Sequence, residues 1–395
     1  MTDDRSRLAK LFRRVMTSGS YLPEIDGLRF IAIAAVVAVH VWGYWLRLES
    51  RPYPVYGVID ASLSSLLALG GYGVHLFFII SGFVLATPFC RHVHKEGPAV
   101  DLRRYFWRRV TRLEPPYVVS MLMFFAAAPF AEKGSWSSLF PHLLASLGYV
   151  HELVYKQGSP INNNAWSLEI EVQFYLLMPA LAMMLWLPAA ARRSLLSLLI
   201  FLLSANGLWL PPTAPRTILQ YGQFFLMGVL LCDIWMTRWR DKPRTSTADI
   251  PGLVAWPAFI AVNTSVGGIV AGIANPWIMA ALFYSALRGI LHSKVLSYGM
   301  IPLIGGMCYS IYLLHARVIA ITLHLGGRFI PDTGTFWGDY TLAFLACCLP
   351  VLLVSGCFFL FVEKPCMDPL WPQKTRDWIA RVSGRRGGMA TEATP

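Results

Sequence analysis

Long apolar runs recur along the chain and alternate with short segments that contain most of its charged residues. A run of about 20 apolar residues is long enough to cross the hydrocarbon core of a bilayer as a helix. The amphipathic stretch 138–155 lies between such runs, and we expect an interfacial or re-entrant segment there. The runs predict ten membrane-spanning helices, at residues 30–46, 63–89, 115–130, 165–187, 194–211, 217–236, 252–266, 269–288, 303–324 and 340–362.

The composition favours a membrane protein over a soluble one. With 55% hydrophobic and 14% charged residues, the 395-residue chain has too little polar surface for a soluble globule of this size. We therefore predict an all-α, polytopic transmembrane bundle with one membrane domain, residues 21–366, between cytoplasmic tails at 1–20 and 367–395. The first tail is basic and polar and has no apolar signal-peptide stretch. The seven cysteines show no metal-ligand spacing, so no metal site is expected.

The distribution of the 34 Lys and Arg residues bears on the topology, because short cytoplasmic loops retain positive charge. With a cytoplasmic N-terminus, most of these residues fall in predicted inner segments, and the pattern predicts that both ends of the chain are cytoplasmic. The net charge of +12 then reflects topology and contact with anionic lipid, and nucleic-acid binding is not expected. Six basic residues lie in the predicted outer loops: Arg47, Arg51, Lys133, Lys156, Arg216 and Arg328.

The stretch 21–45 contains most of the first predicted span; Arg29 lies beside the start of that span, and His40 lies deep in its body. Their separation is about three helical turns, so the two side chains share one face and lie roughly 16 Å apart along the axis. A histidine at bilayer depth is costly to bury and often marks a functional site. The alternative is an arginine that reaches the membrane surface and a histidine that only packs in the core.

Depth along the predicted spans matches His40 with Glu171, in the fourth span. Each lies about six residues from the outer end of its span, so both would be roughly 9 Å below the outer surface. Such a pair could share a proton, or act as a base and the group that orients it. Alternatively, Glu169 and Glu171 are interfacial carboxylates stabilised by the helix dipole, a description that suits Glu169 better.

Arginines recur at helical spacing on the predicted inner side, in residues 101–117. Arg109 and Arg112 are i,i+3 neighbours on one helix face. Guanidinium groups bind phosphate through paired hydrogen bonds, so we expect an anionic ligand here. The alternative is a basic loop that only sets topology and touches anionic lipid.

Polar residues also occur inside other predicted spans. Residues 70–83 of the second span contain glycines, which permit close helix approach, together with His75, which suits packing better than chemistry. Ser310 and His315 lie in the ninth span, and residues 362–365 end the tenth. Packing and capping explain these later residues as well as catalysis does.

Six segments can be compared with known families as a set. They are YLPEIDGLRFIA with an Arg-x10-His pair, GVHLFFIISGF, YFWRRVTRLEPPY, NNNAWSLEIEVQFYLLMP, CYSIYLLH and FVEKP. In this order and spacing they resemble the acyltransferase 3 family of integral-membrane O-acyltransferases, which modify bacterial cell-surface sugars and some secondary metabolites. Each segment alone is a weak signal, but six in order are specific.

The resemblance implies acyl-CoA, expected to be acetyl-CoA, as the donor and the bacterial inner membrane as the location. It also implies that His40 is the essential histidine of the Arg-x10-His motif and that Arg109 and Arg112 form the RxxR motif. Glu171 matches the acidic position after the Trp-Ser-Leu motif. The chain carries Glu169 where the family usually has a small or weakly polar residue, so the carboxylate that works with the histidine stays open.

The expected reaction moves an acyl group from cytoplasmic acyl-CoA to a hydroxyl of a cell-surface or exported glycan. Arg109 and Arg112, with Arg29 further in, would hold the donor phosphates. His40 would act as general base, and Glu171 would orient its imidazole. The residues expected to line the acceptor site are Trp166, Glu169, Tyr175 and His75.

Two alternatives remain at this stage. A proton-coupled transporter or flippase would also use buried histidine and glutamate residues. The inverted repeat that many transporters show is not visible in the sequence. The same acyl-transfer chemistry on an antibiotic or lipid acceptor differs from the first interpretation only in the acceptor.

Overall fold

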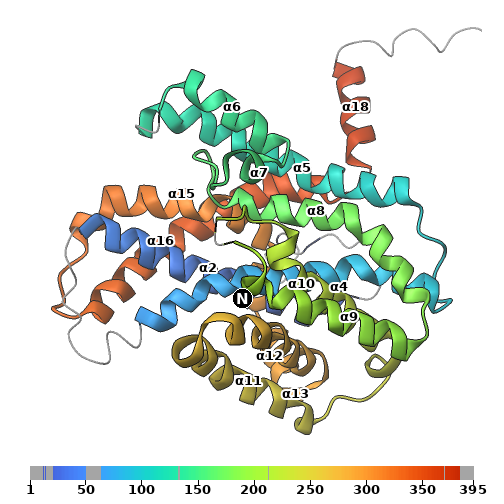
Figure 1. The fold of residues 1–395 in the computed structure, drawn as a ribbon. Helices are drawn as coiled ribbons and strands as arrows, with labels where there is room; N and C mark the ends of the chain where they lie inside the picture. Colours follow the sequence, from blue (N-terminus) through green and yellow to red (C-terminus); the bar gives the residue numbers. More distant parts are fainter. Residues whose placement is uncertain are drawn as a thin grey trace, which may run out of the picture.

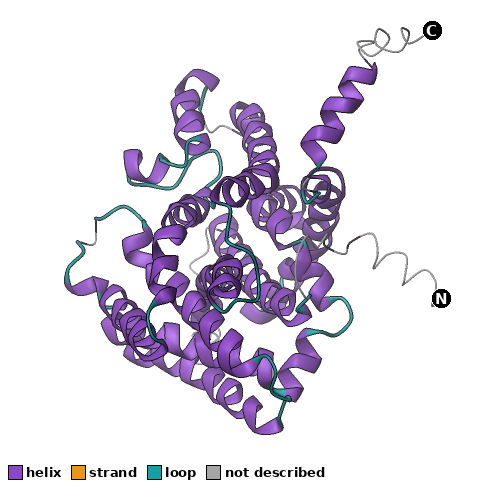
Figure 2. Cartoon of the chain, turned by 90° about the vertical axis from the view of Figure 1, so that its right-hand side faces the viewer, coloured by secondary structure: helices purple, strands orange, loops and turns teal. Residues whose placement is uncertain are grey.

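The fold is a bundle of helices (Figure 1). The structure, a computed structural model, describes Phe12, Arg14 and residues 21–49, 64–131, 134–211, 213–368 and 370–382. Among these residues Figure 2 shows helices and loops without strands, which confirms the predicted all-α class. The main helices are α2 (Pro23–Glu49), α4 (Gly73–Val93), α5 (Leu102–Ala127), α6 (Trp136–Leu147), α7 (His151–Tyr155), α8 (Ala165–Leu181), α9 (Ala189–Ser204), α10 (Ile218–Ile234), α11 (Ile250–Ala261), α12 (Gly268–Arg288), α13 (Ile290–Leu296), α14 (Ile301–Gly306), α15 (Cys308–Gly326), α16 (Phe336–Phe358), α17 (Lys364–Cys366) and α18 (Trp371–Val382).

Eight helical segments among the described residues are long and apolar enough to cross a membrane. They coincide with eight of the ten predicted spans, and the chain is an integral, multi-pass membrane protein. The segments are Pro23–Leu46, Ser64–Val93, Leu102–Phe130, Ala165–Trp186, Ile218–Trp239, Gly268–Arg288, Cys308–Phe329 and Phe336–Cys366.

The other two predicted spans, residues 194–211 and 252–266, are helical but shorter. Helix α9 has 16 residues, and α11 has 12 before a five-residue π-helix, Val262–Val266. At 1.5 Å per residue, a helix of this length is about 24 Å long, less than the hydrocarbon core of about 30 Å. These two segments therefore fall below the length of a typical span.

Helix α9 nevertheless runs antiparallel to α10 along its whole length. Arg193, near the start of α9, donates a hydrogen bond to Asp233 at the end of α10 (2.7 Å). Asn206, just after α9, donates to the carbonyl oxygen of Gln220 near the start of α10 (2.9 Å). Because α10 is one of the eight apolar spans, α9 traverses the same thickness in the opposite direction.

Glycines bring α4 and α10 into close contact, as predicted for the second span. A Cβ atom at Gly82 would lie 2.1 Å from the carbonyl oxygen of Phe225. A Cβ atom at Gly228 would lie 2.1 Å from the carbonyl oxygen of Ile79. No side chain fits at either crossing point, and the two backbones pack directly against each other.

The amphipathic stretch 138–155 forms parts of two short helices, α6 and α7, which have 12 and five residues. Neither is long enough to cross a bilayer. Helix α6 packs against α5, and α7 packs against α8 (Figure 1). This pair covers the first turn of α8, where several predicted site residues lie.

Several segments predicted to be cytoplasmic meet on one side of the bundle. Arg244 forms an ion pair with Glu24 at the start of α2, and the same carboxylate accepts a hydrogen bond from Ser293 (2.8 Å). Arg240 forms a second ion pair with Glu96. The segment before the first predicted span and the segments after the second, sixth and eighth spans were predicted to lie on the same side of the membrane. Their contacts place them on one side of the bundle. That this face is the cytoplasmic one stays a prediction.

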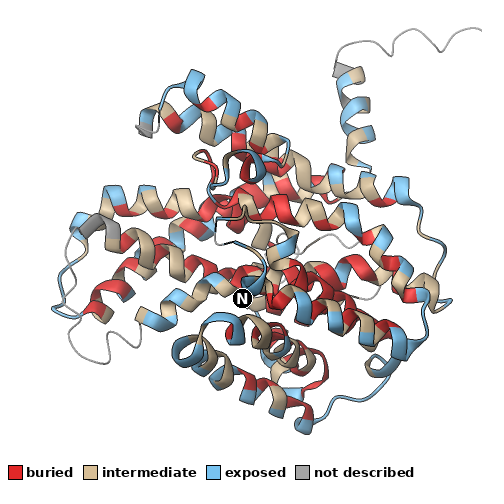
Figure 3. Ribbon diagram, viewed as in Figure 1, coloured by how far each residue is buried: buried red, intermediate tan, exposed pale blue. Residues whose placement is uncertain are grey.

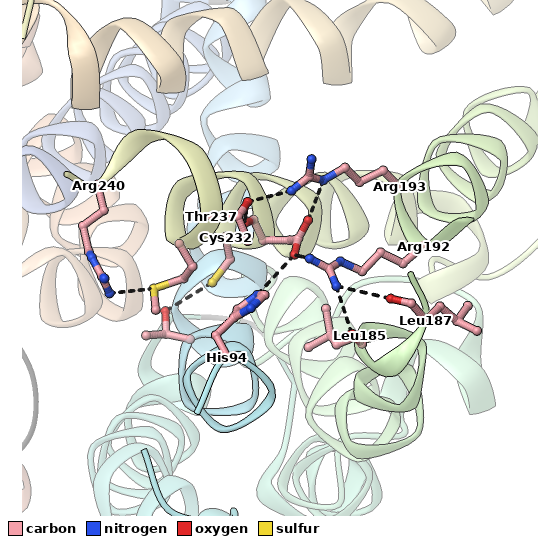
Figure 4. Close-up of polar contacts among 11 residues, drawn as sticks. His94, Leu185, Leu187, Arg192, Arg193, Cys232, Thr237 and Arg240 are labelled. Atoms are coloured by element: carbon pink, nitrogen blue, oxygen red, sulfur yellow. Dashed lines mark hydrogen bonds and ion pairs between the residues drawn. The ribbon is translucent and has the colours of Figure 1, made fainter. Parts of the chain in front are cut away.

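A buried ionic cluster joins three helices on the same side (Figure 4). Asp233 accepts contacts from Arg192 (2.5 Å) and Arg193 (2.7 Å), and His94 Nε2 lies 3.6 Å from the same carboxylate. Arg193 also donates to Thr237. The cluster ties the end of α4 to the start of α9 and the end of α10.

Burial follows the pattern of a protein surrounded by lipid. Buried residues concentrate where the helices cross, and exposed residues occupy the outer faces (Figure 3). Large apolar side chains lie exposed on these faces, among them Leu349 and Phe361. Such a surface is unfavourable in water and favourable against acyl chains.

Candidate active site

His40 lies in the middle of α2, where a second histidine contacts it. Its Nδ1 atom is 2.8 Å from the carbonyl oxygen of Val36, one turn earlier. The Nε2 atom of His315, on α15, lies 3.4 Å from the same Nδ1 atom. The two rings meet edge to face, with centroids 4.7 Å apart. The structure thus places His40 in a histidine pair deep in the bundle.

Arg29 lies on α2 toward the other end of the predicted Arg/His face. It is mostly buried and forms an ion pair with Asp26, one turn earlier. Arg14 approaches the same carboxylate at 3.5 Å. Arg29 is also close enough to Glu171 and Cys308 to interact electrostatically with both. A buried guanidinium therefore faces the interior between α2, α8 and α15.

Glu171 is held by α4 and faces the same interior. Its Oε1 atom accepts a hydrogen bond from Ser81 (2.7 Å). Tyr175, one turn further along α8, is close enough to interact with it electrostatically. The structure thus places Glu171 beside Ser81, Tyr175 and Arg29, whereas the contact described above for His40 is with His315.

A pocket of about 120 Å³ lies between α5, α8 and α15. Glu171 and Tyr175 line it from α8, Arg109 from α5 and Tyr309 from α15. The pocket connects the predicted RxxR motif with the acidic residue that follows the Trp-Ser-Leu motif. Glu114 lines the pocket as well, so Arg109 is the one positively charged donor among two carboxylates and three tyrosines in this lining.

The two arginines of the RxxR motif have different surroundings. The guanidinium of Arg109 lies 3.8 Å from the centroid of the Tyr105 ring and donates to the Tyr105 carbonyl oxygen (3.0 Å). Its Nε atom is buried and has no hydrogen-bond partner among the described residues. Arg112 instead interacts electrostatically with Glu363. Arg109 therefore has donor capacity toward the pocket, and Arg112 balances a buried carboxylate.

The two C-terminal motifs meet each other. Glu363, at the end of the tenth predicted span, is buried and accepts hydrogen bonds from the backbone N–H (3.0 Å) and hydroxyl of Ser310. The same α15 motif supplies Ser310 to Glu363 and His315 to His40. Sequence reasoning left these residues between packing and catalysis. The sequence feature that could have identified this motif as part of the site is His315, a second histidine at bilayer depth.

Glu169, expected at the acceptor site, contacts α7, and Trp166 lies one turn earlier on α8. Glu169 is buried and accepts a hydrogen bond from the backbone N–H of Glu152 (2.9 Å). Glu152 forms a bidentate ion pair with Arg216, at 2.8 and 3.0 Å. The guanidinium of Arg216 in turn lies 4.8 Å from the centroid of the Trp166 ring. The structure brings these two predicted residues together through Glu152 and Arg216.

His75 is surrounded by aromatic rings. It stacks on Phe224 (centroids 4.4 Å apart) and meets Tyr72 edge to face (4.8 Å). The ring of Tyr221 lies 5.5 Å from His75 and 5.2 Å from Trp166. The packing role preferred for His75 from the sequence agrees with this environment. The Tyr221 ring therefore lies between His75 and Trp166 and contacts both. The described residues contain no group of three or more His, Cys, Asp or Glu side chains suited to a metal ion.

Comparison with known proteins decides the family. A model of an acyltransferase domain, acyltransferase 3, matches residues 22–360, which include every predicted site residue. The chain belongs to the acyltransferase 3 family. The expectation from the six sequence segments is thereby confirmed.

Two named relatives share this domain. The chain is similar to the peptidoglycan O-acetyltransferase OatA of Listeria monocytogenes, with 27% identity over 78% of this chain and 51% of the relative. It is also similar to the O-acetyltransferase OatA of Staphylococcus aureus, with 25% identity over 80% of this chain and 53% of the relative. The chain thus spans about half the length of each relative. No solved structure matches it.

Proposed function

We propose that this acyltransferase is an O-acetyltransferase that moves an acetyl group from acetyl-CoA to a hydroxyl of a cell-surface or exported glycan. The proposal rests mainly on the arginine-containing pocket beside Glu171 and Arg29, on the inner side of the histidine pair. Both named relatives are O-acetyltransferases, and one is named for peptidoglycan. The proposed location is the bacterial inner membrane, with the face that carries Glu24 and Arg244 in the cytoplasm.

The donor would enter from that face. Arg109 offers donor groups toward the pocket, and fork-shaped guanidinium groups suit the phosphates of the nucleotide part of CoA. Arg112 lies one turn further along α5 and adds positive charge. Arg29 continues the positive potential inward along α2, so the thioester end of the donor would approach His40. Acetyl-CoA as donor is supported by this order of charged groups along the bundle.

His40 would act as general base. It would accept the proton of the acceptor hydroxyl as that oxygen attacks the thioester carbonyl. The C–S bond then breaks, and the CoA thiolate takes up the proton from the imidazolium, so His40 is neutral again. Glu171 would limit the charge excess created by Arg29 and Arg109. In the glycan site, the Trp166 ring and the buried Glu169 would offer a stacking surface and a carboxylate, with His75 nearby, whereas Tyr175 lines the donor pocket.

The test uses the purified full chain in lipid with radiolabelled acetyl-CoA and a glycan fragment, and counts acetylated product. His40→Ala should lower the rate by roughly 100-fold or more while acetyl-CoA still binds. Arg109→Ala should weaken acetyl-CoA binding by about 1.5–3 kcal/mol. Arg240→Ala is the control, because this arginine lies on the same face but pairs with Glu96 at the surface.

Two outcomes would count against this proposal. A wild-type rate of product formation by His40→Ala would remove the histidine from the chemistry. Equal acetyl-CoA affinity in Arg109→Ala and Arg240→Ala would remove the pocket from the donor site and leave these arginines as determinants of topology.

A further inference from the structure

Helix α18 (Trp371–Val382) projects beyond the other helices of the bundle in both views (Figures 1 and 2). In Figure 1 it runs across the direction of α8 and α15, which belong to membrane spans. The last apolar span ends at Cys366, and the chain turns directly after it, because the backbone N–H of Trp371 donates to the carbonyl oxygen of Asp368 (3.0 Å). A helix that begins so soon after a span and runs across it lies at the level of the membrane surface.

The first turn of α18 is attached to α5. The indole N–H of Trp371 donates a hydrogen bond to the carbonyl oxygen of Thr111 (2.8 Å). Thr111 lies in the sequence between Arg109 and Arg112, so α18 begins at the level of the RxxR motif. This hydrogen bond fixes where α18 starts, and from there the helix extends past the bundle (Figure 1).

The sequence of α18, WPQKTRDWIARV, is amphipathic. Trp371, Thr375 and Ile379 recur every four residues and therefore share one face of the helix. Ile379 is 53% exposed on this face. Lys374 and Arg376 are also exposed, and at 100° per residue they lie on opposite borders of the face. Apolar and aromatic residues on one face, with basic residues beside them, are typical of helices that lie in the plane of a membrane surface.

The length and the charge of α18 both favour a lipid surface as its partner. A helix of 12 residues is marginally stable in water, and burial of its apolar face supplies the stabilisation that length does not. Basic residues add attraction when the lipid headgroups are anionic. Three basic residues and one acidic residue lie in α18: Lys374, Arg376, Arg381 and Asp377.

We propose that α18 is an interfacial helix that binds anionic phospholipid at the membrane surface. The face that carries Trp371 and Ile379 lies toward the acyl chains, and Lys374 and Arg376 lie at the level of the lipid phosphates. On the predicted topology this surface is the cytoplasmic one. The role of α18 is separate from the proposed acyl transfer and does not depend on it.

Hydrogen exchange of the full chain in lipid nanodiscs tests this assignment. The discs contain either phosphatidylcholine alone or equal parts of phosphatidylcholine and phosphatidylglycerol. Each basic residue near an anionic surface contributes about a fivefold preference for the bound state. Backbone amides of residues 373–382 should therefore exchange at least about fivefold more slowly in the discs with phosphatidylglycerol. Equal exchange in the two kinds of disc would overturn the proposal.

Two pairs of variants separate the charge of α18 from its apolar face. Arg376→Gln should speed exchange in α18 about fivefold in the anionic discs only, whereas Arg238→Gln, at an exposed arginine beyond the end of α10, should leave α18 unchanged. Ile379→Asp should speed exchange at least about 10-fold in both kinds of disc, and Ile379→Leu should retain the protection. Equal exchange within either pair would overturn the proposal, and unchanged exchange in α5 and α10 shows that the bundle is folded.

Photo-crosslinking of the same purified chain identifies what covers the apolar face. With p-benzoylphenylalanine in place of Ile379, irradiation in the anionic discs should add the mass of one phospholipid to the chain. A crosslink to a second copy of the chain, without a lipid adduct, would overturn the lipid assignment and make α18 a contact between copies.

Discussion

Replacing Asp233 with Asn should destabilise the bundle strongly. The Asp233 side chain is completely buried, and its partners Arg192 and Arg193 are only 7% and 18% exposed. Removing the carboxylate charge leaves two guanidinium groups in a poorly hydrated site. Breaking a buried ion pair in this way costs about 3–5 kcal/mol. Because Asn has nearly the same size as Asp, the change isolates the charge from the packing.

Glu96→Gln provides a matched control. It also converts a carboxylate that pairs with an arginine into an amide, and it lies on the same side of the bundle. Its side chain and that of Arg240 are each about one third exposed, at 32% and 36%. Water and salt screen such a pair, which is typically worth about 0–1 kcal/mol. The two variants should therefore differ by about 2 kcal/mol or more.

The measurement is the free energy of unfolding of the full chain in mixed micelles, titrated with a denaturing detergent and followed by tryptophan fluorescence. The Asp233 variant should unfold at a clearly lower detergent fraction than wild type, and the Glu96 variant close to wild type. If both stay within about 1 kcal/mol of wild type, the cluster in Figure 4 is hydrated and the argument from burial is wrong.

Two other predictions concern packing and pH. Gly228→Ala should separate α4 from α10 and cost at least about 1–3 kcal/mol of unfolding free energy, because its Cβ would lie 2.1 Å from the Ile79 carbonyl oxygen; Gly71→Ala, with open space at that position, should behave like wild type in the same titration. Burial lowers the pKa of His151, whose Nε2 atom lies 2.8 Å from Nδ1 of His142. In the unfolded chain this histidine binds a proton below about pH 6.5, whereas in the folded protein it binds one only at a lower pH. The folded α6–α7 pair is therefore most stable above that pH and loses stability as the pH is lowered. Hydrogen exchange in α6 and α7 should accelerate between pH 7 and 5 in wild type but not in His151→Phe.

The sequence predicted the class of fold and the position of most spans because lipid imposes a minimum apolar length on each helix. That rule is weaker for α9 and α11, where the helices are shorter than the predicted apolar runs. Apolar residues in and after the short 3-10 helix Asn206–Leu208, such as Leu208 and Trp209, extended the predicted span beyond the end of α9. For α9, the evidence that it crosses the same thickness as α10 comes from the contacts between the two helices and not from its length.

The histidine pair could not be predicted by counting residues. Counting from the ends of spans gives approximate depth but not the direction in which a side chain points around its helix. Many residues share the depth of His40, and Glu171 was selected among them because it carries charge. The partner that α15 supplies, His315, lies 275 positions further along the chain. Its selection depends on how α2 and α15 are rotated against each other.

The two carboxylates of α8 show the same dependence on rotation. Residues two positions apart on a helix point about 200° apart, so Glu169 and Glu171 cannot face one site. Glu169 accepts the backbone N–H of Glu152 at the start of α7, and Glu171 accepts the hydroxyl of Ser81 on α4. A carboxylate that satisfies a backbone N–H in a helix cap holds α7 in place, while a carboxylate beside buried arginines tunes the charge of a pocket. Under the proposed function, Glu171 would therefore act in the donor pocket, and Glu169 would belong to the wall that α6 and α7 form over the proposed acceptor site.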